Sequence, residues 1–392
     1  RTASRPSSTD RLRASYVLVA GGPSGAGRVT RLLSSGLLGV CSLPAGGAAP
    51  PVRHAGRVRD LTALPKAHLH LHLTGGMRPG TLIELAAAQG RALPAGLLDP
   101  LGARVDVTVR RGWPRFQRLY DAAREVLVGP VEVRRVVREI VEDEATAGTG
   151  WLELQVDPSS YATRLGGLPA AVELLLDALA DGSQATGVGT ALVLAANRTR
   201  HPAEAETLAR LARRWAGRGV VGLGLSNDET VGVMEDFAKA FRLARDAGLV
   251  AVPHAGELRG PRSVRAAVED LGAVRLGHGV RSVEDPALLE LMADRQVVCE
   301  VCPASNVALG VLPSAAAVPV RRLRAAGVPV ALGADDPLLF RSGLLAQYET
   351  ARTAWQLDDE GLADLARCSV RGSTAPAHIR ARLLAGIDAW LA

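Results

Sequence analysis

A short apolar strand followed by a helix recurs along this chain, and the repeat constrains the fold more than any other sequence feature. Eight strands are predicted, at Ala67–Leu73, Trp151–Val156, Ala191–Ala196, Val220–Leu225, Leu249–Pro253, Val274–Gly277, Val297–Val301 and Val328–Leu332. Helical patterns lie between them, at Glu132–Ala147, Ala171–Ala180, Ala203–Ala216, Val231–Ala247, Ser263–Leu271, Pro286–Ala293 and Val320–Ala326. This alternation indicates a parallel sheet of the α/β class, and eight units predict closure into a (β/α)8 TIM barrel.

Additional sequence follows the first strand and also closes the chain. The insertion spans residues 92–129 and carries an apolar stripe at helical spacing, formed by Trp113, Phe116, Leu119 and Tyr120. We predict that it forms a helical lid over the barrel, and the alternative is an ordinary amphipathic helix packed against it. Two more helices are predicted, at Asp359–Cys368 and Ala377–Leu391.

The first strand has two different faces. Histidines alternate with apolar residues in the stretch Ala67-His68-Leu69-His70-Leu71-His72-Leu73. Period two is typical of a strand whose faces meet different surroundings. Imidazole is the commonest metal ligand in proteins, and two imidazoles at i and i+2 can hold one ion. The sequence therefore favours a metal site here over three histidines that only form hydrogen bonds.

Polar residues also follow four later strands. They are Leu225-Ser226-Asn227-Asp228-Glu229, His254-Ala255-Gly256-Glu257, Gly277-His278-Gly279 and Gly333-Ala334-Asp335-Asp336-Pro337, after strands four, five, six and eight. A structural histidine or a capping aspartate explains each one separately. Because the active site of such a barrel lies at the carboxyl ends of its strands, their joint placement predicts a single site at one end.

The residue types at these ends suit a metal ion. The predicted ligands are His70, His72, His254 and Asp335. Three neutral nitrogens and one anion suit zinc, with cobalt, iron or manganese as alternatives, and a catalytic zinc keeps one position for water. The pKa of such a water falls to about 7. His278 is placed to orient or deprotonate this water, and Glu257 can donate a proton to the substrate.

We predict that the site holds a single ion. Some metallohydrolase barrels hold two metals, which a modified lysine on the fourth strand bridges. The chain has two lysines, Lys66 and Lys239, and neither lies on that strand. One Zn²⁺ per chain is therefore the expected cofactor.

The basic charge of the chain belongs to its first residues. Residues 1–59 hold nine arginines and one acidic residue, whereas the remaining sequence has 37 basic and 39 acidic residues. The body thus offers no electrostatic case for nucleic acid, and no apolar stretch reaches the length of a membrane span. Four scattered cysteines favour a reducing compartment, so we expect a cytoplasmic protein.

The first 58 residues differ from the rest of the chain. They are rich in Ser, Gly, Pro and Arg and sustain no helical period, which favours a disordered extension or translated sequence upstream of the true start. A secretion signal at Arg28–Pro44 is the alternative. Residues 59–392 are expected to form one barrel domain.

Five motifs, in this order, resemble those of the adenosine deaminase family of metal-dependent barrels. They are Pro65-Lys66-Ala67-His68-Leu69-His70-Leu71-His72-Leu73, Ser226-Asn227-Asp228-Glu229, His254-Ala255-Gly256-Glu257, Gly277-His278-Gly279 and Ala334-Asp335-Asp336-Pro337. The resemblance covers about residues 60–392. The chain is especially similar to the actinobacterial branch of adenosine/adenine deaminases, which includes aminodeoxyfutalosine deaminases of menaquinone biosynthesis.

The resemblance implies a role for each site residue. The implied zinc ligands are His70, His72, His254 and Asp335. Glu257 would protonate purine nitrogen 1, His278 would handle the attacking water, and Asp336 would form a hydrogen bond with nitrogen 7. Water activated by zinc would attack carbon 6 and ammonia would leave, which is the reaction logic of the zinc base deaminases.

One departure from the family pattern bears on the substrate. Nucleoside-specific members usually have an aspartate two residues past the second histidine, where it binds the ribose 5′-hydroxyl. This chain has Thr74 at that position. A shorter, uncharged side chain leaves room for a substituent, which favours 5′-modified adenosines such as aminodeoxyfutalosine or methylthioadenosine. The alternative is that Thr74 caps the following helix.

Two further departures change the surroundings of the site. Asn227 stands where the family often has a glycine that offers its backbone amide to ring nitrogen 3. The amide is retained, but a side chain now lies nearby. His68 stands where glutamate is common, and its depth in the barrel favours packing over metal binding.

The expected activity is zinc-dependent hydrolytic deamination of the 6-amino group of an adenine nucleoside, either adenosine or a 5′-modified adenosine. The first alternative is a deaminase of free adenine, which needs a blocked ribose site. The second is a non-catalytic binding protein on the same barrel, which the complete ligand set together with Glu257 and His278 disfavours. The expected partner is a small purine nucleoside or base, with no nucleic acid and no membrane.

Overall fold

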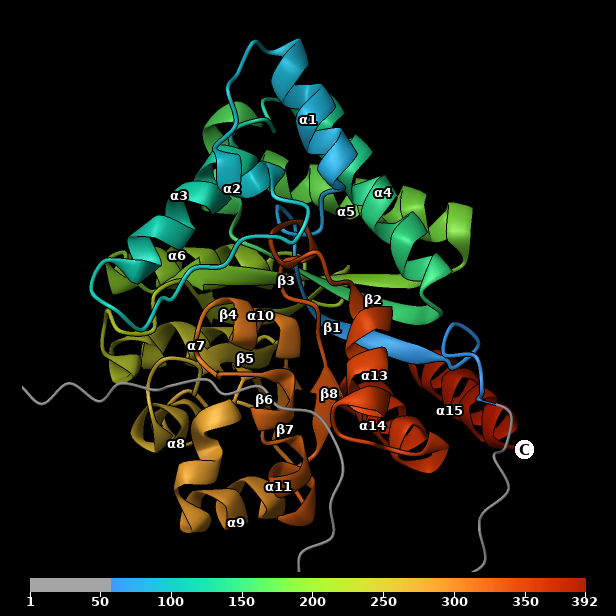
Figure 1. Cartoon of the computed structure of the whole chain (residues 1–392). Helices are drawn as coiled ribbons and strands as arrows, with labels where there is room; N and C mark the ends of the chain where they lie inside the picture. Colours follow the sequence, from blue (N-terminus) through green and yellow to red (C-terminus); the bar gives the residue numbers. More distant parts are fainter. Residues whose placement is uncertain (1–57) are drawn as a thin grey trace, which may run out of the picture. The chain divides into compact units, whose positions relative to one another are not determined.

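A parallel eight-stranded barrel forms the centre of the molecule. The computed structural model describes residues 58–392, so the predicted extension at residues 1–58 lies outside the described residues except for Val58. The strands are hydrogen-bonded in chain order as β1 (Lys66–His72), β2 (Thr149–Val156), β3 (Gly189–Asn197), β4 (Val220–Ser226), β5 (Val250–Ala255), β6 (Arg275–His278), β7 (Val298–Val301) and β8 (Val330–Leu332). A parallel bridge between Leu71 and Asp335 returns the sheet to β1 (Figure 1). The predicted (β/α)8 barrel is confirmed.

Helices surround the barrel. The longer ones are α4 (Pro130–Thr146), α5 (Leu168–Thr186), α6 (Pro202–Arg213), α7 (Ala238–Arg245), α8 (Pro261–Glu269), α9 (Pro286–Asp294), α13 (Leu344–Thr353), α14 (Asp359–Gly372) and α15 (Ala377–Leu391). Shorter ones are α10 (Pro303–Ala308), α11 (Val320–Ala325) and α12 (Pro337–Phe340). Proline opens many of these helices, where its missing N–H would have no partner in any case. Within residues 58–392 no helix has both the length and the apolar character needed to cross a membrane.

One predicted helix begins later than expected. The prediction placed it at Val231–Ala247, but a 3₁₀ turn at Met234–Phe237 precedes α7. Gly232 adopts a positive φ of 79° and Val233 is extended, so the helix cannot start at residue 231. The prediction of a helix is confirmed for Ala238–Arg245, whereas the turn at Met234–Phe237 was not predicted.

The insertion after β1 is helical, as predicted. It contains α2 (Ala95–Leu98) and α3 (Gly112–Arg124), and α1 (Pro79–Ala88) precedes it. α1 projects at the top of Figure 1, above the barrel. In α3 the side chain of Phe116 is buried, and Trp113 and Tyr120 pack partly buried against the core. The insertion thus contributes aromatic side chains near the carboxyl ends of the strands.

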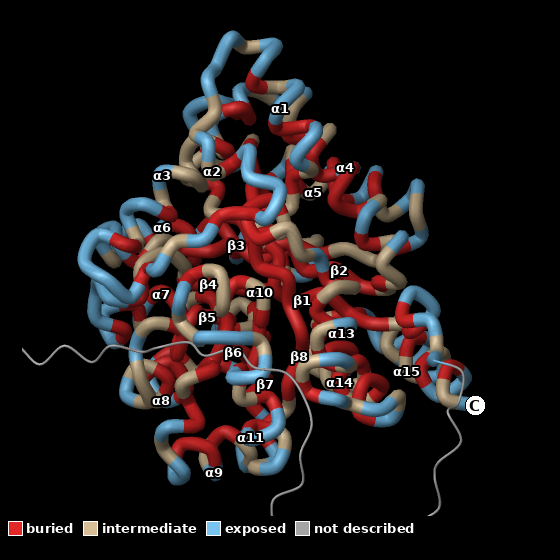
Figure 2. The backbone as a smooth tube through the Cα atoms, viewed as in Figure 1, coloured by how far each residue is buried: buried red, intermediate tan, exposed pale blue. Residues whose placement is uncertain are grey.

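The strands are buried on both faces, and their residues form the red centre of Figure 2. Every residue of β1 except His72 is buried, and β6, β7 and β8 are buried throughout. Helices cover the outer face and side chains fill the interior, which is why most strands read as continuous apolar runs. Polar groups inside such a barrel must find partners among themselves.

Candidate metal centre and active site

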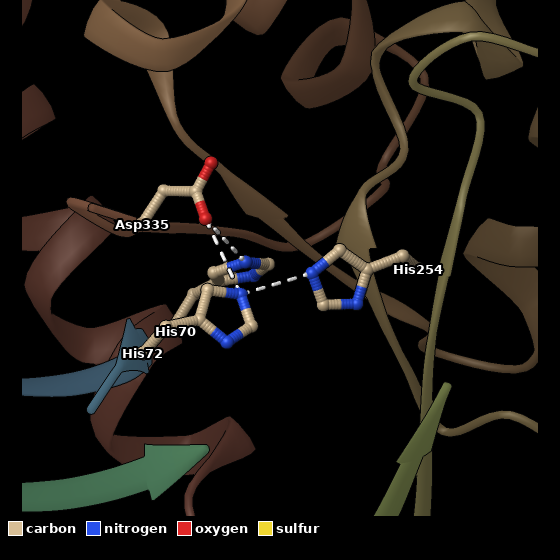
Figure 3. A group of neighbouring side chains, drawn as sticks. All are labelled: His70, His72, His254 and Asp335. Carbon is tan, nitrogen blue, oxygen red and sulfur yellow. Dashed lines mark hydrogen bonds and ion pairs between the residues drawn. The ribbon is translucent and has the colours of Figure 1, made fainter. Parts of the chain in front are cut away.

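Three strands bring together the four predicted ligands, His70, His72, His254 and Asp335, which we call the metal cluster (Figure 3). Nε2 of His72 lies 3.2 Å from Nε2 of His254 and 3.3 Å from Oδ1 of Asp335. The same Oδ1 lies 3.5 Å from Nε2 of His70. One ligand atom of each residue therefore lies within 4.8 Å of the other three, a spacing that one ion could bridge.

A buried network orients the innermost ligand. Nδ1 of His70 lies 3.1 Å from Glu300, which turns Nε2 of His70 towards the cluster. Glu300 also accepts a hydrogen bond from Arg275 at 2.7 Å, and Arg275 pairs in turn with Glu153. A carboxylate behind a metal-binding histidine fixes its tautomer and ring orientation. Sequence reasoning missed Glu300, although a lone acidic residue in the apolar run of β7 was a signal for it.

The chemistry of the donor set fits a metal cation. Burial lowers the pKa of His70, but the nearby carboxylates of Asp335 and Glu300 outweigh this effect and raise its pKa to about 10. The surroundings of His70 thus stabilise a positive charge next to Asp335 and Glu300. Nε2 of His70 has no hydrogen-bond partner among the described residues, and two imidazole nitrogens face each other across 3.2 Å. A cation that accepts lone pairs from all of these nitrogens would satisfy them together.

Three predicted site residues have strained backbones. Asn227, His278 and Asp335 adopt positive φ angles of 79°, 64° and 61°. Such conformations cost non-glycine residues about 1–3 kcal/mol and collect at functional sites, where they redirect a side chain. Each residue lies at or just after a strand end, so the left-handed turn aims its side chain into the mouth of the barrel.

Glu257 and His278 lie beside the metal cluster. Both are buried, and Oε1 of Glu257 lies 3.6 Å from Nε2 of His278. Burial, followed by the negative charge of Asp335, raises the pKa of Glu257 well above its usual value, which favours the protonated form of its carboxyl. Burial also lowers the pKa of His278 to about 3, which keeps its imidazole neutral. The pair thus offers a proton donor and a neutral base side by side.

Asp336 directs a buried carboxyl into the same site. Its Oδ1 has no hydrogen-bond partner within residues 58–392. Burial and the neighbouring charge of Asp335 raise the pKa of Asp336 well above its usual value. Gly75 makes this position possible, because a Cβ atom at residue 75 would overlap the Asp336 side chain. A protonated Asp336 can donate a hydrogen bond to an acceptor in the pocket.

A pocket extends from the metal cluster towards the insertion. Its inner end is lined by His72, His254, Glu257, His278, Asp335 and Asp336. Aromatic side chains form the opposite wall, and we call Trp113, Phe116, Tyr120 and Tyr161 the outer wall. Polar residues also line the pocket, namely Gln117, Arg124, Asp157, Ser160 and Asn197. Aromatic walls with a few convergent polar groups are typical of small-molecule sites.

Asn227 connects the insertion to the barrel. Nε1 of Trp113 donates a hydrogen bond to Oδ1 of Asn227 at 3.0 Å, and both residues line the pocket. The ring of Trp113 also meets Phe116 edge-on at 5.3 Å. The family resemblance predicts a role for the backbone amide of Asn227, whereas this contact of its side chain was not predicted.

Thr74 lies behind the pocket wall. Its hydroxyl is 2.6 Å from the Tyr161 hydroxyl, and Tyr161 rather than Thr74 faces the pocket. The alternative that Thr74 caps the next helix is wrong, because α1 begins at Pro79 with Arg78 at the cap position. The short side chain of Thr74 was expected to leave space for a 5′-substituent of the nucleoside, and the Tyr161 ring borders this space. Its use by a 5′-substituent stays a prediction.

His68 lies deeper in the barrel, as its position in β1 predicted. Its Nε2 accepts a hydrogen bond from the Ala334 amide at 3.0 Å, and its Nδ1 lies 2.9 Å from Glu144. His68 is fully buried and does not belong to the metal cluster. It contributes to the packing beside the loop that carries Asp335.

Comparison with known proteins gives a consistent result. The sequence model of the adenosine deaminase family matches residues 65–390. A Streptomyces coelicolor protein provisionally named adenosine/adenine deaminase is 59% identical over 339 residues, which cover 86% of this chain and 99% of that protein. The aminodeoxyfutalosine deaminase of the same organism is 37% identical over 352 residues, which cover 85% of this chain and 88% of the relative.

A solved structure shares the fold over most of its length. It is described as adenine deaminase from Arthrobacter aurescens and superposes with a TM-score of 0.76 at 28% identity. The match covers 83% of this chain and 99% of that one. The names of these relatives refer to different adenine derivatives.

Proposed function

Because the chain belongs to the adenosine deaminase family, we propose that it removes the 6-amino group of an adenine nucleoside by hydrolysis, giving the 6-oxo purine and ammonia. One observation carries the proposal. A buried carboxyl, a buried imidazole and a set of metal ligands meet at one end of the pocket, with Glu257 and His278 only 3.6 Å apart. A non-catalytic barrel would have no need of this arrangement.

The residues divide the reaction among them. Water adds to carbon 6 and displaces an electron pair onto purine nitrogen 1. The protonated Glu257 donates its proton to this nitrogen, so no negative charge builds up there. The neutral His278 orients the water and accepts its proton. The protonated Asp336 donates a hydrogen bond to nitrogen 7, which is an acceptor. His278 then passes the proton taken from the water to the 6-amino group, the new 6-hydroxyl returns a proton to Glu257, and ammonia leaves as the carbon–nitrogen bond breaks and the 6-oxo group forms.

We propose zinc as the metal, held by the metal cluster. Three histidine nitrogens and one carboxylate oxygen are typical zinc ligands. When bound, the ion supplies Lewis acidity, which makes water a better nucleophile at neutral pH. Glu300 supports the proposal, because it holds the His70 ring with Nε2 towards the other ligands.

The polar lining of the pocket supports a nucleoside rather than the free base. The pocket is also lined by Gln117, Arg124 and Ser160, which offer hydrogen-bond donors and acceptors. Free adenine has no group that would reach them, whereas ribose hydroxyls or a 5′-substituent would. The expected substrates are therefore adenosine and 5′-modified adenosines, including methylthioadenosine and aminodeoxyfutalosine.

Free adenine is the second candidate substrate. The bond between Thr74 and Tyr161 sets an aromatic ring against the pocket where a ribose-binding carboxylate is usual in nucleoside-specific relatives. A protein of this fold is also described as an adenine deaminase. Both observations favour a closed ribose site, in conflict with the polar lining of the pocket.

One assay decides between these substrates. Purified protein is incubated with adenine, adenosine, methylthioadenosine and aminodeoxyfutalosine, while the loss of the 6-amino chromophore and the release of ammonia are followed. We expect the highest kcat/KM for one of the three nucleosides, and preference for aminodeoxyfutalosine would point to menaquinone biosynthesis. Turnover of adenine alone would overturn the nucleoside proposal. Inactivity on all four purines would overturn the deaminase proposal.

A further inference from the structure

Glu229 gathers the turn that carries Glu257. It lies three residues after β4 and is buried. Its carboxylate accepts hydrogen bonds from the backbone amides of Gly256 (2.8 Å), Glu257 (3.0 Å), Leu258 (2.6 Å) and Arg259 (2.9 Å), and from the hydroxyl of Ser263 (2.7 Å). Four consecutive amides thus converge on one anion, and hydrogen bonds to an ionised acceptor are roughly twice as strong as neutral ones.

A positively charged residue, Arg198, contacts the end of the strand just before this turn. The buried guanidinium of Arg198 donates a hydrogen bond to the backbone carbonyl of His254 and another to that of Leu225 at 3.4 Å. Within residues 58–392 no basic side chain forms an ion pair with Glu229 at 4.0 Å or less. The partners of the Glu229 carboxylate are therefore the backbone amides of residues 256–259 and the Ser263 hydroxyl.

These hydrogen bonds shape the turn and do not close a helix end. α8 begins at Pro261, and Gly260 stands at its cap position. The four amides precede that helix, and Gly256 in the turn has a positive φ of 74°. His254, by contrast, lies on β5, where its backbone pairs with Gly277 of β6. Glu229 thus acts on the position of Glu257 much more than on that of the metal ligand.

We propose that Glu229 is a positioning residue for the deamination, which fixes the backbone of residues 256–259 so that the Glu257 carboxyl meets the purine ring. The inference rests on the proposed function. A misplacement of a catalytic group by about 1 Å can cost about 10²-fold in rate. The negative charge of Glu229 also adds to burial and to Asp335 in raising the pKa of Glu257.

The test is Glu229→Gln in the zinc-loaded protein. The amide nitrogen of glutamine cannot accept a hydrogen bond, so at least one backbone N–H of the turn loses its acceptor. We expect kcat to fall by about 10²-fold, KM to change by less than about 3-fold, and zinc content to stay the same. Glu229→Asp, which keeps the charge but has a shorter reach, should fall between the wild type and Glu229→Gln.

The same substitution in a protein that already lacks the Glu257 carboxyl distinguishes a positioning role of Glu229 from a general effect on folding stability. In the Glu257→Gln protein, Glu229→Gln should cause no further loss of kcat, because residues that act as a unit are not additive. The matched control is Glu139→Gln, which changes another buried carboxylate, one that accepts a hydrogen bond from Thr81 on α1, away from the pocket. This control should lower the melting temperature and leave kcat unchanged.

Hydrogen exchange at residues 256–259 tests the geometry without any substrate. The four amides should be protected in the wild type and should exchange faster in Glu229→Gln. Wild-type exchange, wild-type kcat, or a further loss in the Glu257→Gln background would each overturn the inference. A wild type that turns over no purine would instead overturn the proposed function, and the exchange rates would still decide whether Glu229 positions the turn.

Discussion

The metal cluster and the outer wall face the same pocket but are held in different ways. The cluster is built from barrel strands and their ends, and the buried network through Glu300 and Arg275 supports it. The outer wall comes from α3 and from the segment after β2. Two side-chain hydrogen bonds join it to the barrel, from Trp113 to Asn227 and between Tyr161 and Thr74.

This difference separates the reaction from the choice of substrate. The strands cannot move without disturbing the core, so the chemistry of the cluster is fixed together with the fold. The inserted helix can change its sequence or position while the barrel stays intact. We therefore expect changes at the cluster to affect kcat, and changes at the outer wall to affect KM and substrate preference.

Removal of the metal should have the largest effect. Dialysis against a chelator should lower turnover by at least about 10³-fold, because the water loses its Lewis acid, and added Zn²⁺ should restore it. The melting temperature should fall as well, since an ion present at 1,000 times its Kd stabilises the folded state by about 4 kcal/mol. Activity, metal content and thermal unfolding are measured on the same samples. A metal-free protein that keeps its kcat would contradict the role given to the cluster.

Glu257→Gln should come next in size. The amide cannot donate the proton that nitrogen 1 requires, so kcat should fall by about 10²–10⁴-fold. Zinc content should not change, because Glu257 lies outside the metal cluster. Glu269→Gln, the same exchange at an exposed position of α8, is the control and should behave as wild type. Loss of zinc from Glu257→Gln would show that Glu257 is a ligand.

The repeat and the residues at the strand ends were readable from the sequence for physical reasons. Strands buried on both faces appear as short apolar runs, and such a run can be recognised within a few neighbouring residues. Polar residues at matching points of the repeat, such as His254 and Asp335, meet because the barrel closes. The position of His68 away from the cluster followed from its depth in β1, farther from the carboxyl end of the strand than His70 and His72. The start of α7 did not, since Gly232 and Val233 interrupt the helical pattern.

Contacts between distant side chains could not be predicted in the same way. Trp113 and Asn227 are 114 residues apart in the chain, and Thr74 and Tyr161 are 87 apart. Each pair depends on how the insertion folds over the barrel, and no local pattern encodes this. A polar residue in an apolar strand, such as Glu300, signals that a partner exists but does not identify it.

The smallest effect is expected at the link between the insertion and the barrel. Asn227→Gly removes the side chain, and glycine adopts the required φ of 79° without strain. Trp113→Phe keeps an aromatic ring but removes the N–H donor. Each change should raise KM for the preferred purine by about 5-fold, close to the net value of about 1 kcal/mol for one hydrogen bond, and should change kcat by less than about 2-fold.

The double variant sharpens this prediction. If the hydrogen bond between Trp113 and Asn227 is the cause, the two changes remove the same interaction, and the double variant should resemble either single variant. Trp215→Phe, two residues after the end of α6 and outside the pocket lining, serves as the control for a lost indole. Additive increases in KM would show that Trp113 and Asn227 contact the substrate independently. A loss of kcat as large as that of Glu257→Gln would mean that the outer wall takes part in the chemistry, and the division between the two regions would fail.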